Sequence, residues 1–135
     1  MLKRTFSAII VAGGLASEAV GSEMQDQHSV CMAESGGVTS AMLDCVAVAV
    51  DNAETANAIS QDNLFRTANA ELRTKLLRAQ EHWSAYRLST CQVEAVAAGN
   101  GSFSNVALVD CTLRITWDRS QWLERILANP DVVEQ

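Results

Sequence analysis

The chain has 135 residues, one proline, four cysteines and a formal net charge of −6 at pH 7. This length suits one small domain, and the scarcity of proline favours long helices with few sharp turns. Nucleic acids and anionic membranes bind clustered lysine and arginine side chains, and the sequence has no such cluster, so we exclude both as partners. A charged partner, if there is one, is expected to be cationic.

The N-terminal segment, residues 1–21, is typical of a secretory signal peptide. Lys3 and Arg4 precede a short apolar run, and small residues follow it. The run is too short to cross a bilayer, so no transmembrane segment is expected. Cleavage before Ser22 would leave eight basic and fifteen acidic residues, a formal charge of −7. We therefore expect residues 22–135 to form one domain that is periplasmic or secreted; the alternative is a cytosolic protein with an apolar N-terminal helix.

The first half of the exported part is predicted to contain two helices. Glu23–Glu34 is predicted as a short helix that ends at the turn Ser35–Gly37. A second helix is predicted over about Ala41–Ile59, because its many alanines favour helix over strand. Its apolar stripe at helical spacing consists of Met42, Val46, Ala49 and Ala53. The polar stretch Ser60–Asn63 is interpreted as a link or as the N-cap of the next helix.

The second half is predicted to be a helical hairpin. No proline or glycine interrupts Leu64–Ala98, which is predicted as the longest helix, and its apolar stripe consists of Leu72, Leu76, Ala79, Trp83 and Tyr86. The stretch "AGNGSFSN" then forms a turn, with Ser104 as the expected cap of a fourth helix over about Asn105–Ala128. Asn129-Pro130 ends that helix.

The four cysteines are separated by thirteen, forty-five and nineteen residues. None forms the close pair that a zinc or redox site needs, so neither a metal nor another cofactor is expected. An even number in an exported chain indicates two disulfides, with three possible connectivities. We favour the neighbouring pairs, Cys31 with Cys45 and Cys91 with Cys111, each contributing about 3 kcal/mol. The expected fold is all-α: a small disulfide-stapled helical bundle with a long antiparallel helical hairpin.

The predicted hairpin also contains residues at spacings that are typical of one protein family. These residues are Leu77, Gln80, Trp83, Tyr86, Arg87, Cys91, Gly99, Gly101, Ser102, Cys111, Thr116, Arg119 and Leu123. In these positions the chain resembles the LprI-like lysozyme inhibitor family of small exported bacterial domains. The resemblance extends over roughly Cys31–Leu123 and is weaker before Leu76. It implies a disulfide-stapled domain of the cell envelope that inhibits lysozyme. Where the family commonly has an acidic residue after the arginine, this chain has Leu88.

Most of these motif residues are expected to be structural. Helical spacing places Arg87 and Arg119 near the tryptophan face, where arginine stacks on aromatic rings or ties helices together; the alternative is that they bind a partner. Gln80 and Thr116 are expected to form hydrogen bonds between the helices, either with each other or with a backbone carbonyl; the alternative is that they are surface contacts with a partner. Of the three tryptophans, Trp117 is predicted to be the exposed one and an interface anchor.

The sequence favours a binding protein over an enzyme. His28 and His82 lie far apart, and no nucleophile is placed beside either, so catalysis is not expected. Our first hypothesis is an inhibitor that binds a basic lysozyme-type cell-wall hydrolase; the alternative is a structural or adaptor domain without inhibitory activity. The expected binding element is the turn formed by Gly99, Asn100, Gly101, Ser102 and Phe103. Glu94 and Asp110 are expected to attract a basic enzyme towards it.

Overall fold

The computed structural model describes the backbone of residues 16–133 and the side chains of residues 22–132. All regular elements in this part of the chain are helices, which confirms the all-α prediction. Residues 1–15 of the predicted signal peptide lie outside the described residues. No helix in the described part is long and apolar enough to span a membrane.

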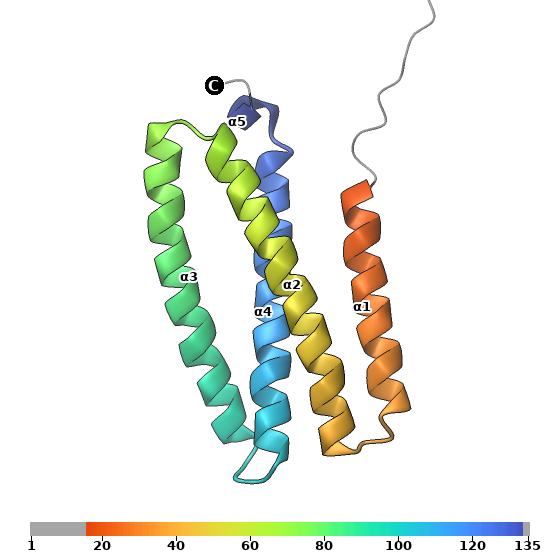
Figure 1. The fold of residues 1–135 in the computed structure, drawn as a ribbon. Helices are drawn as coiled ribbons and strands as arrows, with labels where there is room; N and C mark the ends of the chain where they lie inside the picture. Colours follow the sequence, from red (N-terminus) through yellow and green to blue (C-terminus); the bar gives the residue numbers. More distant parts are fainter. Residues whose placement is uncertain (1–15, 134–135) are drawn as a thin grey trace, which may run out of the picture.

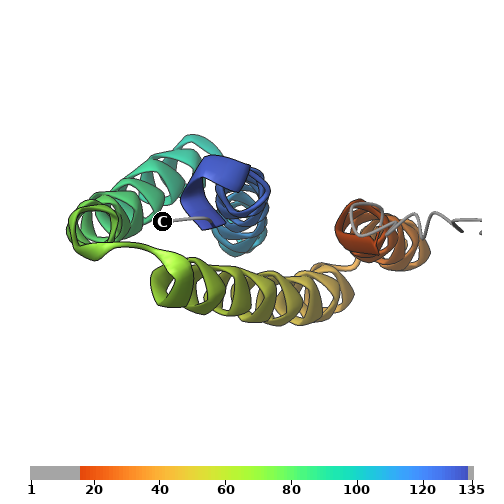
Figure 2. The ribbon, with the colours of Figure 1, turned by 90° about the horizontal axis from the view of Figure 1, so that it is seen from above.

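Four long helices and one short helix make up the described chain. They are α1 (Ala16–Glu34), α2 (Thr39–Thr67), α3 (Ala70–Ala97), α4 (Phe103–Leu127) and α5 (Pro130–Val133). The central helix is α4, which packs against both α2 and α3 (Figure 1). The first helix packs mainly on α2, and Figure 2 shows it at the edge of the molecule opposite to α3. The fold is therefore a three-helix bundle with α1 added on one side.

The boundary between the second and third helices differs from the prediction. Ser60–Asn63 does not interrupt the second helix, because α2 continues to Thr67. With 29 residues, α2 is longer than α3, which has 28 and was predicted to be the longest helix. The chain turns instead at Ala68–Asn69, where both residues are extended. The Asn69 side chain accepts a hydrogen bond from the Leu72 backbone N–H at 2.9 Å, which makes Asn69 the N-cap of α3.

The α3–α4 turn lies where it was predicted, with one change in its details. Gly99 has a φ of 98°, a left-handed conformation that favours glycine. Ser104 is not the cap, because it lies inside α4 and its hydroxyl donates to the Gly101 carbonyl at 2.8 Å. The helix begins at Phe103, two residues earlier than predicted. At the other end, α4 stops before Asn129-Pro130 as expected, and the short helix α5 follows.

The core consists of three apolar clusters along the central helix. One lies between α2 and α4, and its buried residues are Val46, Ala49, Ala53 and Leu113. A second closes the end near α5 and consists of Leu64, Ala68, Leu76 and Leu123. The third surrounds the disulfide between α3 and α4 and consists of Cys91, Cys111 and Ile115, with Trp83 packed against it. Three of the four residues of the predicted stripe of the second helix, Val46, Ala49 and Ala53, are thus part of the core.

The two disulfides have the connectivity favoured from the sequence. Cys31–Cys45 joins α1 to α2 with a Cα–Cα distance of 5.7 Å, and Cys91–Cys111 joins α3 to α4 with a Cα–Cα distance of 5.4 Å. Each bond lies near the closed end of a helical hairpin, and so restrains the turn that connects its two helices. Figure 1 shows these two turns, between α1 and α2 and between α3 and α4, at the same end of the molecule. The disulfide-stapled bundle with a long antiparallel hairpin is confirmed.

Candidate functional site

The family-like residues meet at the seam between α3 and α4, where arginines and tryptophans form a stack. The Arg87 guanidinium lies 4.7 Å from the centre of the Trp83 ring. The Arg119 guanidinium lies 5.7 Å from the same ring and 4.2 Å from the ring of Trp122. Both arginines thus stack on aromatic rings, as helical spacing predicted. Trp122 has no place in the predicted motif, although its position three residues after Arg119 puts both on one helix face.

Arg87 connects three helices through one nitrogen. Its Nη1 donates to the Glu54 carboxylate of α2 at 2.9 Å and to the Thr116 hydroxyl of α4 at 2.9 Å. The counter-charge for Arg87 thus comes from a different helix, while Leu88, the next residue along α3, is exposed. The side chain is one-quarter exposed, so water reaches the ion pair and weakens its net contribution.

Arg119 is held differently from Arg87, because none of its interactions among the described residues is with a carboxylate. Its Nη2 donates to the Gln80 side-chain oxygen at 3.3 Å, while its Nε is buried without a hydrogen-bond partner. Burial lowers the pKa of the Arg119 guanidinium from its usual value. Gln80 therefore interacts with an arginine rather than with Thr116, the other residue suggested as its partner.

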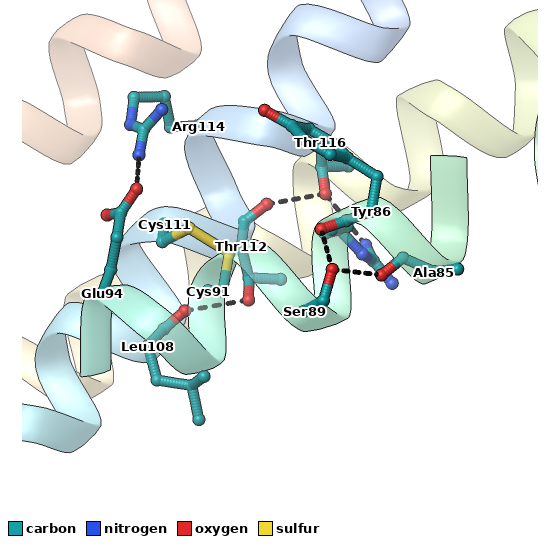
Figure 3. Close-up of a disulfide and its surroundings, with 11 residues drawn as sticks. Ala85, Tyr86, Ser89, Cys91, Glu94, Leu108, Cys111, Thr112, Arg114 and Thr116 are labelled. Carbon is teal, nitrogen blue, oxygen red and sulfur yellow. Dashed lines mark hydrogen bonds and ion pairs between the residues drawn. A yellow bond between two sulfur atoms is a disulfide. The ribbon is translucent and has the colours of Figure 1, made fainter. Parts of the chain in front are cut away.

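A buried polar layer lies beside this stack. Its residues come from α2 and α4, and they are Asn57, Ser60, Thr116 and Ser120. The Thr116 hydroxyl donates to the Thr112 carbonyl at 2.7 Å, and the Ser120 hydroxyl donates to the Thr116 carbonyl at 3.2 Å (Figure 3 shows the first of these). Both hydroxyls donate to carbonyls of their own helix, and that of Thr116 also accepts the bond from Arg87, so the layer is suited to positioning helices.

Two sequence predictions about exposure are wrong. Tyr86 was predicted on the apolar stripe of its helix, but it is 57% exposed, and the motif residue Leu77 is also exposed. Trp117 is not an exposed anchor. It packs on the Val46 cluster, its indole nitrogen is buried without a partner, and its ring lies 5.9 Å from that of His28. An α1 side chain therefore covers the tryptophan that was expected to face solvent.

The turn at Gly99–Phe103 is exposed, but its nearest acidic residues are already paired. The Glu94 carboxylate accepts a hydrogen bond from Arg114 Nη2 at 2.6 Å (Figure 3), and this contact raises the pKa of the Arg114 guanidinium. The Asp110 carboxylate lies 3.7 Å from His28 Nε2. The predicted role of Glu94 as an unpaired attracting charge is therefore not supported.

These features define a class of protein: a small helical bundle with two disulfides and an arginine–tryptophan stack between its hairpin helices. The family model described as lysozyme inhibitor LprI matches residues 31–123 of the chain. The match spans both disulfides and the whole stack, and we conclude that the chain belongs to the LprI family. No curated protein and no solved structure matches it.

Proposed function

We propose that this protein is an exported inhibitor of lysozyme-type cell-wall hydrolases. The observation that carries the proposal is the family match over residues 31–123, since the family is described by lysozyme inhibition. Two disulfides support an oxidising location outside the cytoplasm, either periplasmic or secreted, and a signal peptide at residues 1–21 would direct the chain there before it is removed. The inhibitor would act by binding, without a cofactor.

We propose the turn Gly99–Phe103 as one contact with the hydrolase. Phe103, its last residue, is exposed, and the Cys91–Cys111 bond joins the two helices from which the turn projects. A rigid turn loses little conformational freedom when it enters a cleft, so more of the contact energy remains available for binding.

The test is a cell-wall lysis assay with the oxidised mature protein and lysozymes of several classes. Inhibition by the wild type, weakened in a variant with Ser102→Ala and Phe103→Ala, is the expected result. Exposed Leu77→Ala provides a matched control, because it removes an apolar side chain at the opposite end of α3. Full inhibition by the turn variant would eliminate the turn as a contact. Failure of the wild type against every class would favour a structural or adaptor role in the envelope.

A further inference from the structure

The N-terminal half of the chain has an unusual charge distribution. No lysine or arginine occurs from residue 5 to residue 65, a span that contains α1 and almost all of α2. Five exposed carboxylates on these two helices form no ion pair with a residue that the structure describes, namely Glu23, Asp26, Glu34, Asp44 and Asp51. Glu54 and Asp62, further along α2, are each paired with an arginine, as is Glu94 on α3. Exposed carboxylates without an ion pair among the described residues also occur on α3 and α4, but residues 66–135 contain eight basic and eight acidic residues. The excess negative charge is thus concentrated on α1 and α2.

A groove lies between the same two helices. The axes of α1 and α2 move apart with distance from the Cys31–Cys45 bond (Figures 1 and 2), and a hollow of about 250 Å³ lies between them. Met24, His28 and the disulfide contribute to its lining on one side, and Val48 and Ala49 on the other. His28 is only 11% exposed, and its Nδ1 is buried without a hydrogen-bond partner. The lining is therefore mainly apolar, with one unsatisfied polar atom.

Two exposed valines extend this apolar surface out of the groove. Val48 lines the groove from α2 and is 65% exposed. Val30 is 57% exposed on α1, within a shallow hollow that Glu23, Asp26 and Glu34 also line. The two hollows share Gln27 and Cys31, so they form one continuous surface. Protein interfaces commonly have an apolar centre that is surrounded by a polar or charged rim, and this surface has the same arrangement.

We propose that this α1–α2 groove is the surface that holds a basic, lysozyme-type protein, with Val30 and Val48 as apolar contacts and the five carboxylates as the rim. Four of these carboxylates line the two hollows, and the fifth, Asp51, follows Val48 by three residues on the same helix face of α2. The inference rests on the proposed function, because it names the surface through which the inhibitor would bind. Charge complementarity selects the partner: an uncompensated negative rim attracts a cationic protein and repels an acidic one. It also supplies the attraction that Glu94 cannot, since Glu94 is paired with Arg114.

The first test compares two variants with the same change of charge. Val48→Lys places a cation in the groove, whereas Leu88→Lys places one on α3, where the original side chain is 61% exposed. Affinity for hen-type and other basic lysozymes is measured by calorimetry on the oxidised mature protein. We expect Val48→Lys to weaken binding by about tenfold or more and Leu88→Lys by less than about twofold.

A second comparison tests the rim carboxylates without enlarging any side chain in the groove. It decides whether the groove binds the partner if Val48→Lys also lowers the melting temperature, because loss of binding could then come from unfolding. Asp44→Asn with Asp51→Asn removes two rim carboxylates, and Glu81→Gln with Asp118→Asn removes two exposed carboxylates from α3 and α4. We expect only the first pair to reduce both the affinity and its dependence on salt. Equal effects of the two pairs, with wild-type binding intact, would overturn this inference and leave the proposed function standing. Absence of wild-type binding would remove both.

Discussion

At the scale of single residues, Thr116 is the point where three helices are hydrogen-bonded together. It is fully buried on α4, it accepts a hydrogen bond from Arg87 of α3, and the same arginine nitrogen reaches Glu54 of α2. A hydrogen bond to a charged donor contributes more than one between neutral groups. Thr112, one turn earlier, donates only to the Leu108 carbonyl of its own helix.

We predict that Thr116→Val lowers the free energy of unfolding by about 1.5 kcal/mol, because the charged Arg87 side chain loses an acceptor at a fully buried position while the side-chain volume is kept. Thr112→Val is the matched control and is expected to cost less than about 0.5 kcal/mol. Urea denaturation of both variants measures the difference. Equal losses would show that the bond from Arg87 contributes nothing beyond an ordinary intrahelical contact.

Trp117 allows a second prediction at this scale. The packing of its ring stabilises the fold, whereas its buried N–H without an acceptor destabilises it. Its ring packs on the Val46 cluster and against His28, but its buried Nε1 has no acceptor among the described residues. We expect Trp117→Ala to cost about 3 kcal/mol through the cavity it leaves. Trp117→Phe keeps most of the ring and removes the unsatisfied N–H, so we expect a loss of about 1 kcal/mol or less. Thermal unfolding of the two variants decides.

Residue positions on a helix could be predicted from the sequence, but what covers them could not. Helical spacing correctly placed Arg87 and Arg119 on the face of Trp83. The same reasoning failed for Tyr86 and Trp117. Tyr86 is exposed although it belongs to the predicted apolar stripe of its helix, whereas His28 of α1 packs against Trp117. Exposure depends on which helices are neighbours, and a single sequence does not contain that information.

At the scale of elements, the start of α3 depends on one side chain. Asn69 caps the helix by accepting a hydrogen bond from the Leu72 backbone N–H. We predict that Asn69→Ala lowers the free energy of unfolding by about 1 kcal/mol. Asn63→Ala is the control: Asn63 lies inside α2 and accepts only an exposed hydrogen bond from Arg66, so its loss is expected to cost a few tenths of a kcal/mol. A larger loss from Asn63→Ala in chemical denaturation would contradict the boundary seen here.

The Ser60–Asn63 stretch shows why this boundary was placed wrongly. Its serine, aspartate and asparagine favour caps and turns when they are judged locally. In the structure Ser60 is buried against the central helix, and Leu64 in the next turn is fully buried. Asp62 and Arg66 form an ion pair one turn apart. Packing along the whole helix therefore outweighs a weak local preference, and the chain turns only after Thr67.

At the scale of the whole molecule, the two disulfides stabilise different parts of the fold. Cys91–Cys111 lies inside an apolar cluster of the three-helix bundle, whereas Cys31–Cys45 connects that bundle to α1. Beyond this bond, α1 contacts the bundle mainly through α2, and His28 extends to α4. Loss of the first bond should therefore affect the entire fold, and loss of the second should affect one helix.

We predict that Cys31→Ser with Cys45→Ser leaves cooperative unfolding of α2, α3 and α4 in place but accelerates amide exchange in α1 by about tenfold or more. Cys91→Ser with Cys111→Ser should instead lower the global free energy of unfolding by about 3 kcal/mol. Hydrogen exchange followed by mass spectrometry, together with denaturation curves, measures both effects. Uniform acceleration over all four long helices in the first variant would mean that α1 is an integral part of the core.

The long span without lysine or arginine also determines how the protein can be cut. Trypsin, which cleaves after these residues, cannot separate Cys31 from Cys45, and its sites at Arg87 and Arg114 leave Cys91 and Cys111 on one peptide. Each disulfide would therefore remain as a ring within a single tryptic fragment, two hydrogens lighter than its reduced form. Either alternative connectivity would join the two fragments into one larger species. One non-reducing digest of the exported protein thus reports its cysteine pairing directly, through the presence or absence of that larger mass.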